Sequence, residues 1–319
     1  MKVFGTSCYT RTVAAGLALL ALSYSARAAE APNALAPEAK YLPDNCQMVG
    51  VVRVAQLLGS PAYQQFKKAS PQCAKQEATI AGNMPLPLDQ IDRIVFGGGV
   101  TGGGEDEGLW VVHARTKIDP EHVIWAKTRF DLPAKEKVGK YEVHTRRTES
   151  YCIVGDDLLV FGRLNLLRAV LERDKAPTFS SALDAALKDT DLTATVAFTL
   201  DVTAIRSKRR GETLPFIPGL QMVRAEAATN GLALMAKFGE QIEVSATALA
   251  ATDAGATTLK QEAGHFADFQ SKVLKEDRNA PDDVLDIFKF NVTAEGKRVT
   301  VSTKFGAASA ATLLKLLVQ

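Results

Sequence analysis

Short apolar runs typical of strands alternate along the chain with amphipathic stretches typical of helices, and the order of these segments occurs twice. The first pass begins with residues 48–54, a compact β-branched run that predicts a buried strand. A helix interrupted at residues 59–61 follows, then a hairpin, a second helix and a strand-rich stretch. Leu167 and Leu171 recur at helical spacing and close this pass. The second pass begins with the β-branched run 193–200 and repeats the order.

The repeated order predicts an α+β protein built from two tandem, pattern-related units, residues 41–190 and 191–319. Hairpins between consecutive strands favour antiparallel sheets, and we expect the helices to pack on one face. Residue identity between the passes is slight, so the internal duplication is one of pattern, and a single sheet fused across both units fits it too. The other predicted strands are residues 91–98, 109–114, 141–145, 151–154, 158–161, 231–238, 242–250, 288–293 and 298–304.

The first 28 residues have the pattern of a secretory signal peptide. Lys2 and Arg11 give a positive start, residues 13–22 form a small and apolar run, and small residues precede a cleavage site after Ala28. That run is shorter than the ~20 residues that a helix needs to span a bilayer. Residues 29–40 are rich in Ala and Pro and are expected to form a flexible lead-in. We therefore expect a secreted protein, periplasmic or extracellular after cleavage, with no transmembrane segment in the mature chain.

The composition is that of an ordinary globular protein. Hydrophobic residues make up 46% and charged residues 23% of the 319-residue chain, which argues against disorder and against a membrane bundle. The formal net charge is +2, from 38 basic and 36 acidic residues. Three basic residues and no acidic ones lie in the predicted signal peptide, so cleavage leaves a net charge of −1. A near-neutral chain has no electrostatic reason to bind nucleic acid.

Export changes how the cysteines are interpreted, because three of the four lie beyond the predicted signal peptide. In an oxidising compartment, one disulfide and one free thiol would be the natural division. Cys46 precedes the first predicted strand and Cys73 lies beyond the first helix, so we predict a disulfide between them. Cys152 lies in an apolar strand, where a buried thiol that packs as a small hydrophobic residue is expected.

Two segments of the chain carry a resemblance to a known group of proteins. Residues 41–44 precede a strand that ends in residues 52–54, and residues 155–162 lead into the helix that contains Leu167 and Leu171. With the short leader before them, these segments resemble uncharacterised exported proteins of planctomycete-type bacteria. The resemblance implies export and implies no site residues, because no activity is established for such proteins.

Few residues suggest catalysis. His113 and His144 lie on predicted strands from which they would meet across a sheet, and Glu142 lies beside His144. These three are the first candidates for a hydrolase site assembled from distant parts of the chain. No paired spacing of His or Cys typical of a metal site occurs, and no Gly-x-Ser-x-Gly motif occurs, so we predict neither a metal nor a cofactor.

Two segments are predicted to be turns between strands. Residues 97–104 contain six glycines and precede three acidic residues, which favours a flexible hairpin loop over a phosphate-binding loop. Asp156 and Asp157 follow a glycine between two apolar runs, which favours a hairpin turn. Both segments therefore have a structural interpretation.

The densest cluster of charge beyond the signal peptide is Arg206, Lys208, Arg209 and Arg210, in an irregular stretch that also contains Phe216. A basic loop with an adjacent apolar residue is a candidate surface for an acidic surface polymer, a lipid headgroup or a protein partner. An ordinary solvated loop is the simpler interpretation, and the pattern alone does not separate the two.

Two functions from different classes are open at this point. The favoured one is a non-catalytic exported protein that binds or scaffolds an unknown component of the cell envelope, protein or lipid. The alternative is an exported hydrolase whose site contains His113, His144 and Glu142. A fold of this class carries no function by itself.

Overall fold

The computed structural model describes residues 37–99, 108–121, 123, 134–146, 149–208, 227–276, 286–310 and 312. The strands in this part of the chain are β1 (Met48–Val52), β2 (Ile91–Gly98), β3 (Gly108–Ala114), β4 (Ala134–Val138), β5 (Tyr141–Arg146), β6 (Glu149–Ile153), β7 (Leu158–Gly162), β8 (Val196–Asp201), β9 (Thr229–Phe238), β10 (Gln241–Ala250), β11 (Asn291–Glu295) and β12 (Arg298–Gly306). The helices there, with short 3-10 turns labelled η, are η1 (Pro37–Tyr41), α2 (Val54–Leu58), α3 (Pro61–Ala69), α4 (Pro71–Asn83), η2 (Leu88–Gln90), α6 (Leu164–Glu172), α7 (Ser181–Lys188), α8 (Val202–Lys208), α10 (Asp253–Glu276) and η3 (Asp286–Phe288).

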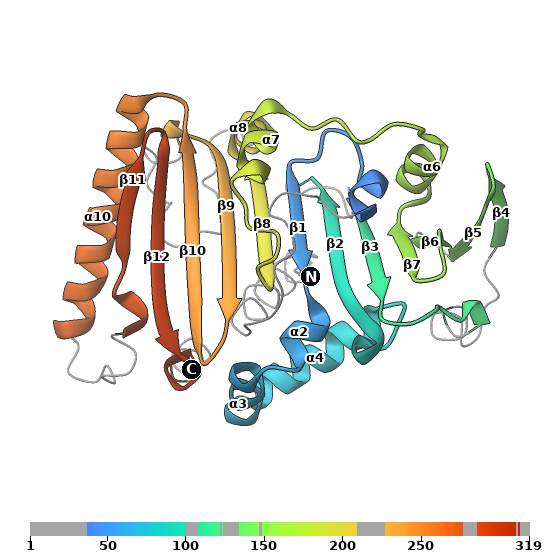
Figure 1. Ribbon diagram of the computed structural model, residues 1–319, viewed down its shortest axis with the longest axis horizontal. Helices are drawn as coiled ribbons and strands as arrows, with labels where there is room; N and C mark the ends of the chain where they lie inside the picture. Colours follow the sequence, from blue (N-terminus) through green and yellow to red (C-terminus); the bar gives the residue numbers. More distant parts are fainter. Residues whose placement is uncertain are drawn as a thin grey trace, which may run out of the picture.

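These strands form one antiparallel sheet with the order β11-β12-β10-β9-β8-β1-β2-β3-β7-β6-β5-β4 (Figure 1). The predicted α+β class is confirmed. Of the two arrangements that the sequence left open, the fused sheet is the one observed, because β1 pairs with β8. In each half the first three strands are neighbours in chain order, and a late strand returns to the third: β7 pairs with β3, and β12 with β10. The division of the chain into two related units stays a prediction.

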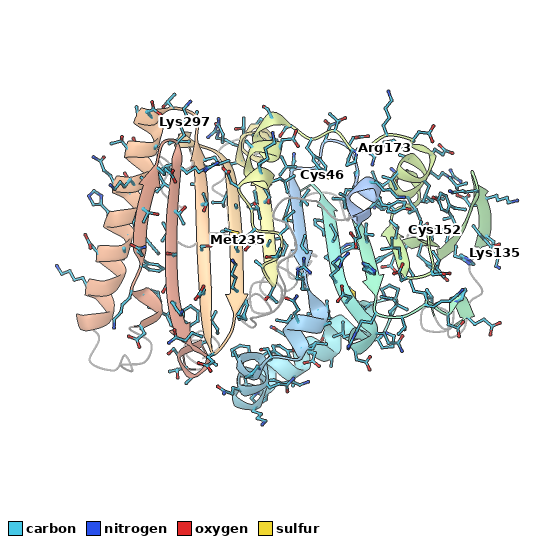
Figure 2. The ribbon with its side chains drawn as sticks, in the orientation of Figure 1. Cys46, Lys135, Cys152, Arg173, Met235 and Lys297 are labelled. Atoms are coloured by element: carbon cyan, nitrogen blue, oxygen red, sulfur yellow. The ribbon has the colours of Figure 1, made fainter. Side chains whose placement is uncertain are left out.

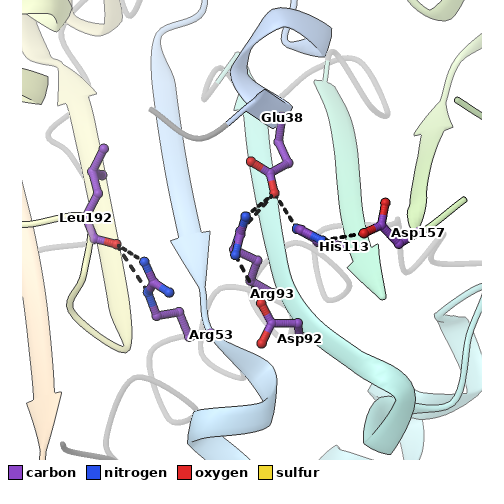
Figure 3. Close-up of polar contacts among 7 residues, drawn as sticks. All are labelled: Glu38, Arg53, Asp92, Arg93, His113, Asp157 and Leu192. Atoms are coloured by element: carbon purple, nitrogen blue, oxygen red, sulfur yellow. Dashed lines mark hydrogen bonds and ion pairs between the residues drawn. The ribbon is translucent and has the colours of Figure 1, made fainter. Parts of the chain in front are cut away.

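The seam between the halves, where β1 pairs with β8, is closely packed. Gly50 lies opposite Phe198, and a Cβ atom on Gly50 would lie 2.5 Å from the Phe198 ring. Only glycine therefore lets the ring lie across β1 at this position. Directly after β1, Arg53 donates to the carbonyl of Leu192 from Nε at 3.4 Å and from Nη2 at 3.3 Å (Figure 3). Backbone pairing, ring packing and this arginine together hold the seam.

Helices cover both faces of the sheet, which corrects the prediction that they pack on one. Adjacent residues of a strand point to opposite faces. On β3, Val112 packs in a cluster with Leu57 of α2, whereas Val111 packs in another cluster with Leu167 of α6. The first face carries α2, α3, α4, α8 and α10, and the second carries η1, α6 and α7. An amphipathic pattern shows which side of a helix is apolar, but not which face of a sheet it meets.

A row of aromatic side chains crosses five neighbouring strands on the first face. Each residue of the row is paired with the next in the sheet register, from β5 to β2: His144, Tyr151, Phe161, Trp110 and Phe96. His144 stacks on Tyr151 with ring centroids 5.1 Å apart, and Trp110 stacks on Phe161 at 6.1 Å. Such cross-strand aromatic pairs stabilise an antiparallel sheet and oppose a slip in its register.

Local sequence sets where three of the helices begin. Ser60 and Ser70 each precede a proline at the start of α3 and α4, and Ser60 Oγ accepts from the Tyr63 N–H at 2.6 Å. Ser180 Oγ accepts from the Leu183 N–H at 3.1 Å and caps α7 in the same way. Proline fits the first turn of a helix and not its interior, so the interruption predicted at residues 59–61 separates α2 from α3.

The N-terminal predictions are tested only from Pro37 onward, since residues 1–36 lie outside the described part of the chain. Residues 37–40, expected in a flexible lead-in, belong instead to η1, and Glu38 there is fully buried. Alanine and proline indicate weak local structure, but tertiary contacts decide whether such a segment docks. Of the helices that the structure describes, none is long and apolar enough to cross a membrane.

The predicted disulfide between Cys46 and Cys73 is wrong, because the cysteines in the described residues are all free and buried. Cys46 packs with Leu42 on the second face of the sheet, whereas Cys73 of α4 packs on the first face. The sheet lies between them, and sequence spacing carries no information about faces. Figure 2 shows Cys46 near β1 and Cys152 on β6. Burial raises the pKa of Cys46 and that of Cys152 to about 12, so both thiols stay protonated at neutral pH.

Candidate functional site

A cluster of charged side chains lies where η1 meets the second face of the sheet (Figure 3). Arg93 on β2 and His113 on β3 are direct partners in the sheet register, so both side chains project from the same face. Tyr41 and Leu42 are buried against that face and bring the preceding turn of η1 over the two basic residues. We call the whole group the Glu38 cluster, and its members are Glu38, Arg93, His113, Asp92 and Asp157.

One oxygen of Glu38 contacts both basic residues of the cluster. Glu38 Oε1 accepts from Arg93 Nε at 2.8 Å and Arg93 Nη2 at 2.6 Å, and it lies 2.7 Å from His113 Nδ1. The Glu38 side chain is 1% exposed, and its Oε2 is buried without a hydrogen-bond partner among the described residues. A buried acceptor without a hydrogen bond costs about 1–3 kcal/mol of stability. Only one of the two carboxylate oxygens of Glu38 is therefore hydrogen-bonded among the described residues.

Two further carboxylates hold the basic side chains from the solvent side. Asp157 Oδ2 lies 3.0 Å from His113 Nε2, and Asp92 Oδ2 accepts from Arg93 Nη1 at 3.1 Å. The side chains of Asp92 and Asp157 are 40% and 48% exposed. An ionised carboxylate only accepts, so both contacts of His113 are hydrogen bonds at the same time when both ring nitrogens carry a proton. The cluster thus directs two basic groups inward and keeps them in place with two outer acids.

The segment that carries Glu38, residues 37–44, is fastened at a second point, and we call it the N-terminal strap. Arg173, directly after α6, donates from Nη2 to the carbonyl oxygens of Lys40 at 2.7 Å and Leu42 at 2.8 Å. Its Nη1 forms an ion pair with Asp44 at 2.9 Å. An arginine therefore holds the strap at each end, and apolar side chains bury its middle.

The structure brings His144 and Glu142 together. His144 Nε2 lies 3.0 Å from Glu142 Oε1, and Lys135 Nζ donates to the same oxygen at 3.0 Å. The hydrogen bond from Lys135 lowers the pKa of the Glu142 carboxyl, while burial lowers the pKa of His144. His144 Nδ1 is buried and has no hydrogen-bond partner in the part of the chain that the structure describes. A buried ring stacked on Tyr151 is typical of a residue that stabilises the sheet.

His113 and His144 do not form a common site. β7 and β6 lie between their strands, so about 14 Å of sheet separates the two backbones. His113 projects from the second face beside Glu38, whereas His144 projects from the first face with Tyr151. Both histidines lie on strands as predicted, but strand order and side-chain direction keep them apart.

The basic cluster predicted as a partner surface lies partly outside the described residues. Arg206 is on α8, and its Nη1 donates to the carbonyl oxygen of Thr229 at 3.5 Å. Lys208 is the last residue of α8. Arg209, Arg210 and Phe216 are not among the residues that the structure describes. The prediction that this stretch contacts a partner stays untested.

Of the Glu38 cluster, the sequence pattern singled out only His113. Glu38 lies in a segment whose composition predicted no structure, and Asp157 was predicted only as a turn residue. Arg93 offered a usable signal, because a charged residue within the apolar run 91–98 needs a partner when its strand is buried. Its partner lies 55 residues earlier in the chain, a pairing that no local pattern reveals.

Comparisons with known proteins give no family for this chain. No family model matches it, and no curated protein matches it. Crystal form III of the spirochete protein TP0453 is 10% identical with a TM-score of 0.49, over 90% of this chain and 99% of that one. Crystal form IV of the same protein is 9% identical with a TM-score of 0.48, over 90% of this chain and 97% of that one. Crystal form I is 10% identical with a TM-score of 0.46, over 92% of this chain and 99% of that one. Likeness at this level carries no argument about function.

No group of three or more His, Cys, Asp or Glu side chains is placed to hold a metal ion in the described part of the chain.

A different feature appears on α10, which packs on the sheet through Ala256 and Leu259 near its N-terminal end. Farther along it, the Phe266 ring lies 5.7 Å from that of Phe290, which in turn lies 6.0 Å from that of Phe288. Phe269 follows Phe266 by three residues and is 61% exposed. We call these four residues the phenylalanine patch: Phe266, Phe269, Phe288 and Phe290.

Proposed function

We propose that the chain is an exported, non-catalytic protein of the cell envelope that binds a protein partner through the phenylalanine patch. Export is supported by the signal-peptide pattern of residues 1–28, with cleavage near Ala28. The resemblance to exported proteins of planctomycete-type bacteria supports the same location. Binding is supported by the surface of α10.

The exposure of Phe269 is the observation that carries this proposal. Burying a phenylalanine side chain stabilises a protein or a complex by about 1.5–3 kcal/mol, and this ring is left 61% exposed one helical turn from Phe266, whose own ring lies 5.7 Å from that of Phe290. Exposed apolar groups that gather in one place mark interaction sites, and aromatic residues are enriched at the centres of protein interfaces.

A protein partner fits this surface better than a lipid does. Amphipathic helices that bind anionic membranes place basic residues beside their apolar side chains. Here the exposed polar residues around Phe269 on α10 are His265, Asp268 and Lys272, a mixed set without the excess of basic residues that such helices carry. The sequence left open whether the bound envelope component is a protein or a lipid, and we therefore propose a protein.

The alternative of an exported hydrolase is less well supported. It required His113 and His144 to meet, and they lie on opposite faces of the sheet with two strands between them. Glu142 lies with His144 and far from His113. The three side chains therefore cannot act together on one substrate.

Native mass spectrometry of the protein purified gently from its own cell envelope tests the proposal. We expect a chain that begins at residue 29, carries three thiols and retains a bound protein. Phe269→Ser is expected to lose that partner. Lys260→Ser is the matched control, because Lys260 is exposed on the same helix and nine residues away, which places it on the opposite side.

Loss of the partner in Phe269→Ser but not in Lys260→Ser would support the patch as the binding surface. Equal retention in both variants would overturn it, and so would a bare monomer in the wild type. A co-purifying lipid in place of a protein would overturn the choice of partner. A mass that includes residues 1–28 would overturn signal cleavage.

A further inference from the structure

We propose that Arg93 and His113 form a binding site for a small monocarboxylate, which the N-terminal strap closes in cis with Glu38. The site is the inner face of the Glu38 cluster on β2 and β3. Its occupant in this structure is a side chain of the same molecule. The site does not depend on the phenylalanine patch, so its test and the test of the proposed function have separate outcomes.

The donor geometry is that of an anion site. Three N–H donors from two neighbouring strands converge on Glu38 Oε1 at 2.6–2.8 Å. The Arg93 side chain is 16% exposed and the His113 side chain 24%, so both donors lie largely out of water. Charge-assisted hydrogen bonds are strong in such surroundings, and basic groups left without an anion there are costly.

The tethered carboxylate does not use the site fully. A guanidinium and a carboxylate pair best as a fork, with each oxygen receiving one of two parallel N–H bonds. Glu38 instead presents a single oxygen to both Arg93 Nε and Arg93 Nη2, and its Oε2 is buried without a partner among the described residues. A free carboxylate is not held by the strap and can turn so that both of its oxygens receive donors.

The donors are held independently of Glu38. Asp92 binds Arg93 Nη1 at 3.1 Å, and Asp157 lies 3.0 Å from His113 Nε2, each from the solvent side. Both basic residues also lie within paired strands. Removing the Glu38 carboxylate therefore leaves a preformed site with its donors aimed at an empty space.

The size of the ligand follows from the side chain that fills the site. Glu38→Ala removes one methylene and one carboxylate, which together have the shape of acetate. Acetate is therefore the probe that matches the space left by this substitution. Formate is shorter by the methyl group, and a longer chain would meet the residues of the strap.

The experiment compares melting temperatures of the exported chain in sodium acetate and in sodium chloride at equal ionic strength and pH. In Glu38→Ala, acetate is expected to raise the melting temperature by about 2–4 °C over chloride, because a ligand bound only by the folded state stabilises it. The wild type is expected to show no such difference, since Glu38 fills the site. Glu136→Ala is the matched control, because Glu136 pairs with Arg168 on the surface and leaves no buried site.

Adding Arg93→Gln to Glu38→Ala is expected to abolish the acetate effect. An acetate effect of equal size in the wild type or in Glu136→Ala would overturn the proposal, as would its survival without Arg93. Where Glu38→Ala is unfolded in chloride, acetate is expected to restore the circular dichroism of the folded chain. A chain that stays unfolded in acetate would then also overturn the proposal.

Discussion

Replacing Gly50 tests whether the seam between β1 and β8 depends on the absence of a side chain. In Gly50→Ala the new Cβ atom would lie 2.5 Å from two atoms of the Phe198 ring, well inside van der Waals contact. The ring or the backbone must shift to relieve this overlap. Because overpacking of this kind costs about 1–3 kcal/mol, we expect the free energy of unfolding to fall by that amount.

Equilibrium unfolding in urea, followed by circular dichroism, measures this loss. Gly82→Ala on α4 is the control, because nothing lies within 4 Å of the Cβ that it adds. A substitution of this kind in a helix is expected to be neutral or to stabilise by up to about 1 kcal/mol. Both variants change one glycine to alanine, so a difference between them reports on the seam.

A double-mutant cycle links the loss to the ring itself. Phe198→Ala removes the atoms that the new methyl would meet, so the two substitutions together are expected to cost less than the sum of their separate effects. A Gly50→Ala variant as stable as Gly82→Ala would refute the argument. Strict additivity in the cycle would show that the cost arises elsewhere than at the ring.

Two other predictions concern buried groups. Cys46, Cys73 and Cys152 are expected to resist a thiol reagent in the folded chain and to react once it is denatured, because burial raises the pKa of each; fast reaction of the folded chain would contradict this. Burial lowers the pKa of His144 from its ordinary 6.5. As the pH is lowered below about 6.5, the unfolded state binds a proton at this ring and the folded state does not, so the free energy of unfolding decreases until the pH reaches the lowered pKa. Melting curves are expected to show a weaker fall in this range for His144→Phe, which keeps the stack on Tyr151; an unchanged pH dependence would be evidence against it.

Local patterns predicted those elements whose determinants lie within a few residues. The β-branched runs at β1 and β8, the helix break before Pro61 and the hairpin turn at Asp156 all depend on neighbours in the sequence. β4 was missed, because this edge strand carries alternate lysines in place of an apolar run and pairs with one neighbour only. Charged edge strands of this kind are common, since they discourage pairing with other chains.

The features that sequence could not predict depend on faces and on distant partners. The pattern around Cys46 and Cys73 shows that both are near apolar segments, but only the folded sheet reveals that they lie on opposite sides of it. The Glu38 cluster is a stronger case, because its buried acid comes from a segment that looked structureless. Its formation requires η1, β2, β3 and the β6–β7 turn to be in place at once.

The pairing of β1 with β8 also constrains the order in which the molecule can fold. Met48 and Leu200 are partners at the centre of the sheet, yet about half of the chain is synthesised between them. A nascent chain can pair β1 with β2 early, but the other edge of β1 stays open until β8 has been made. Contacts of such long sequence separation slow folding, and an open apolar edge invites aggregation in the meantime. The strand that unites the two halves is therefore the one most in need of protection while the protein is incomplete.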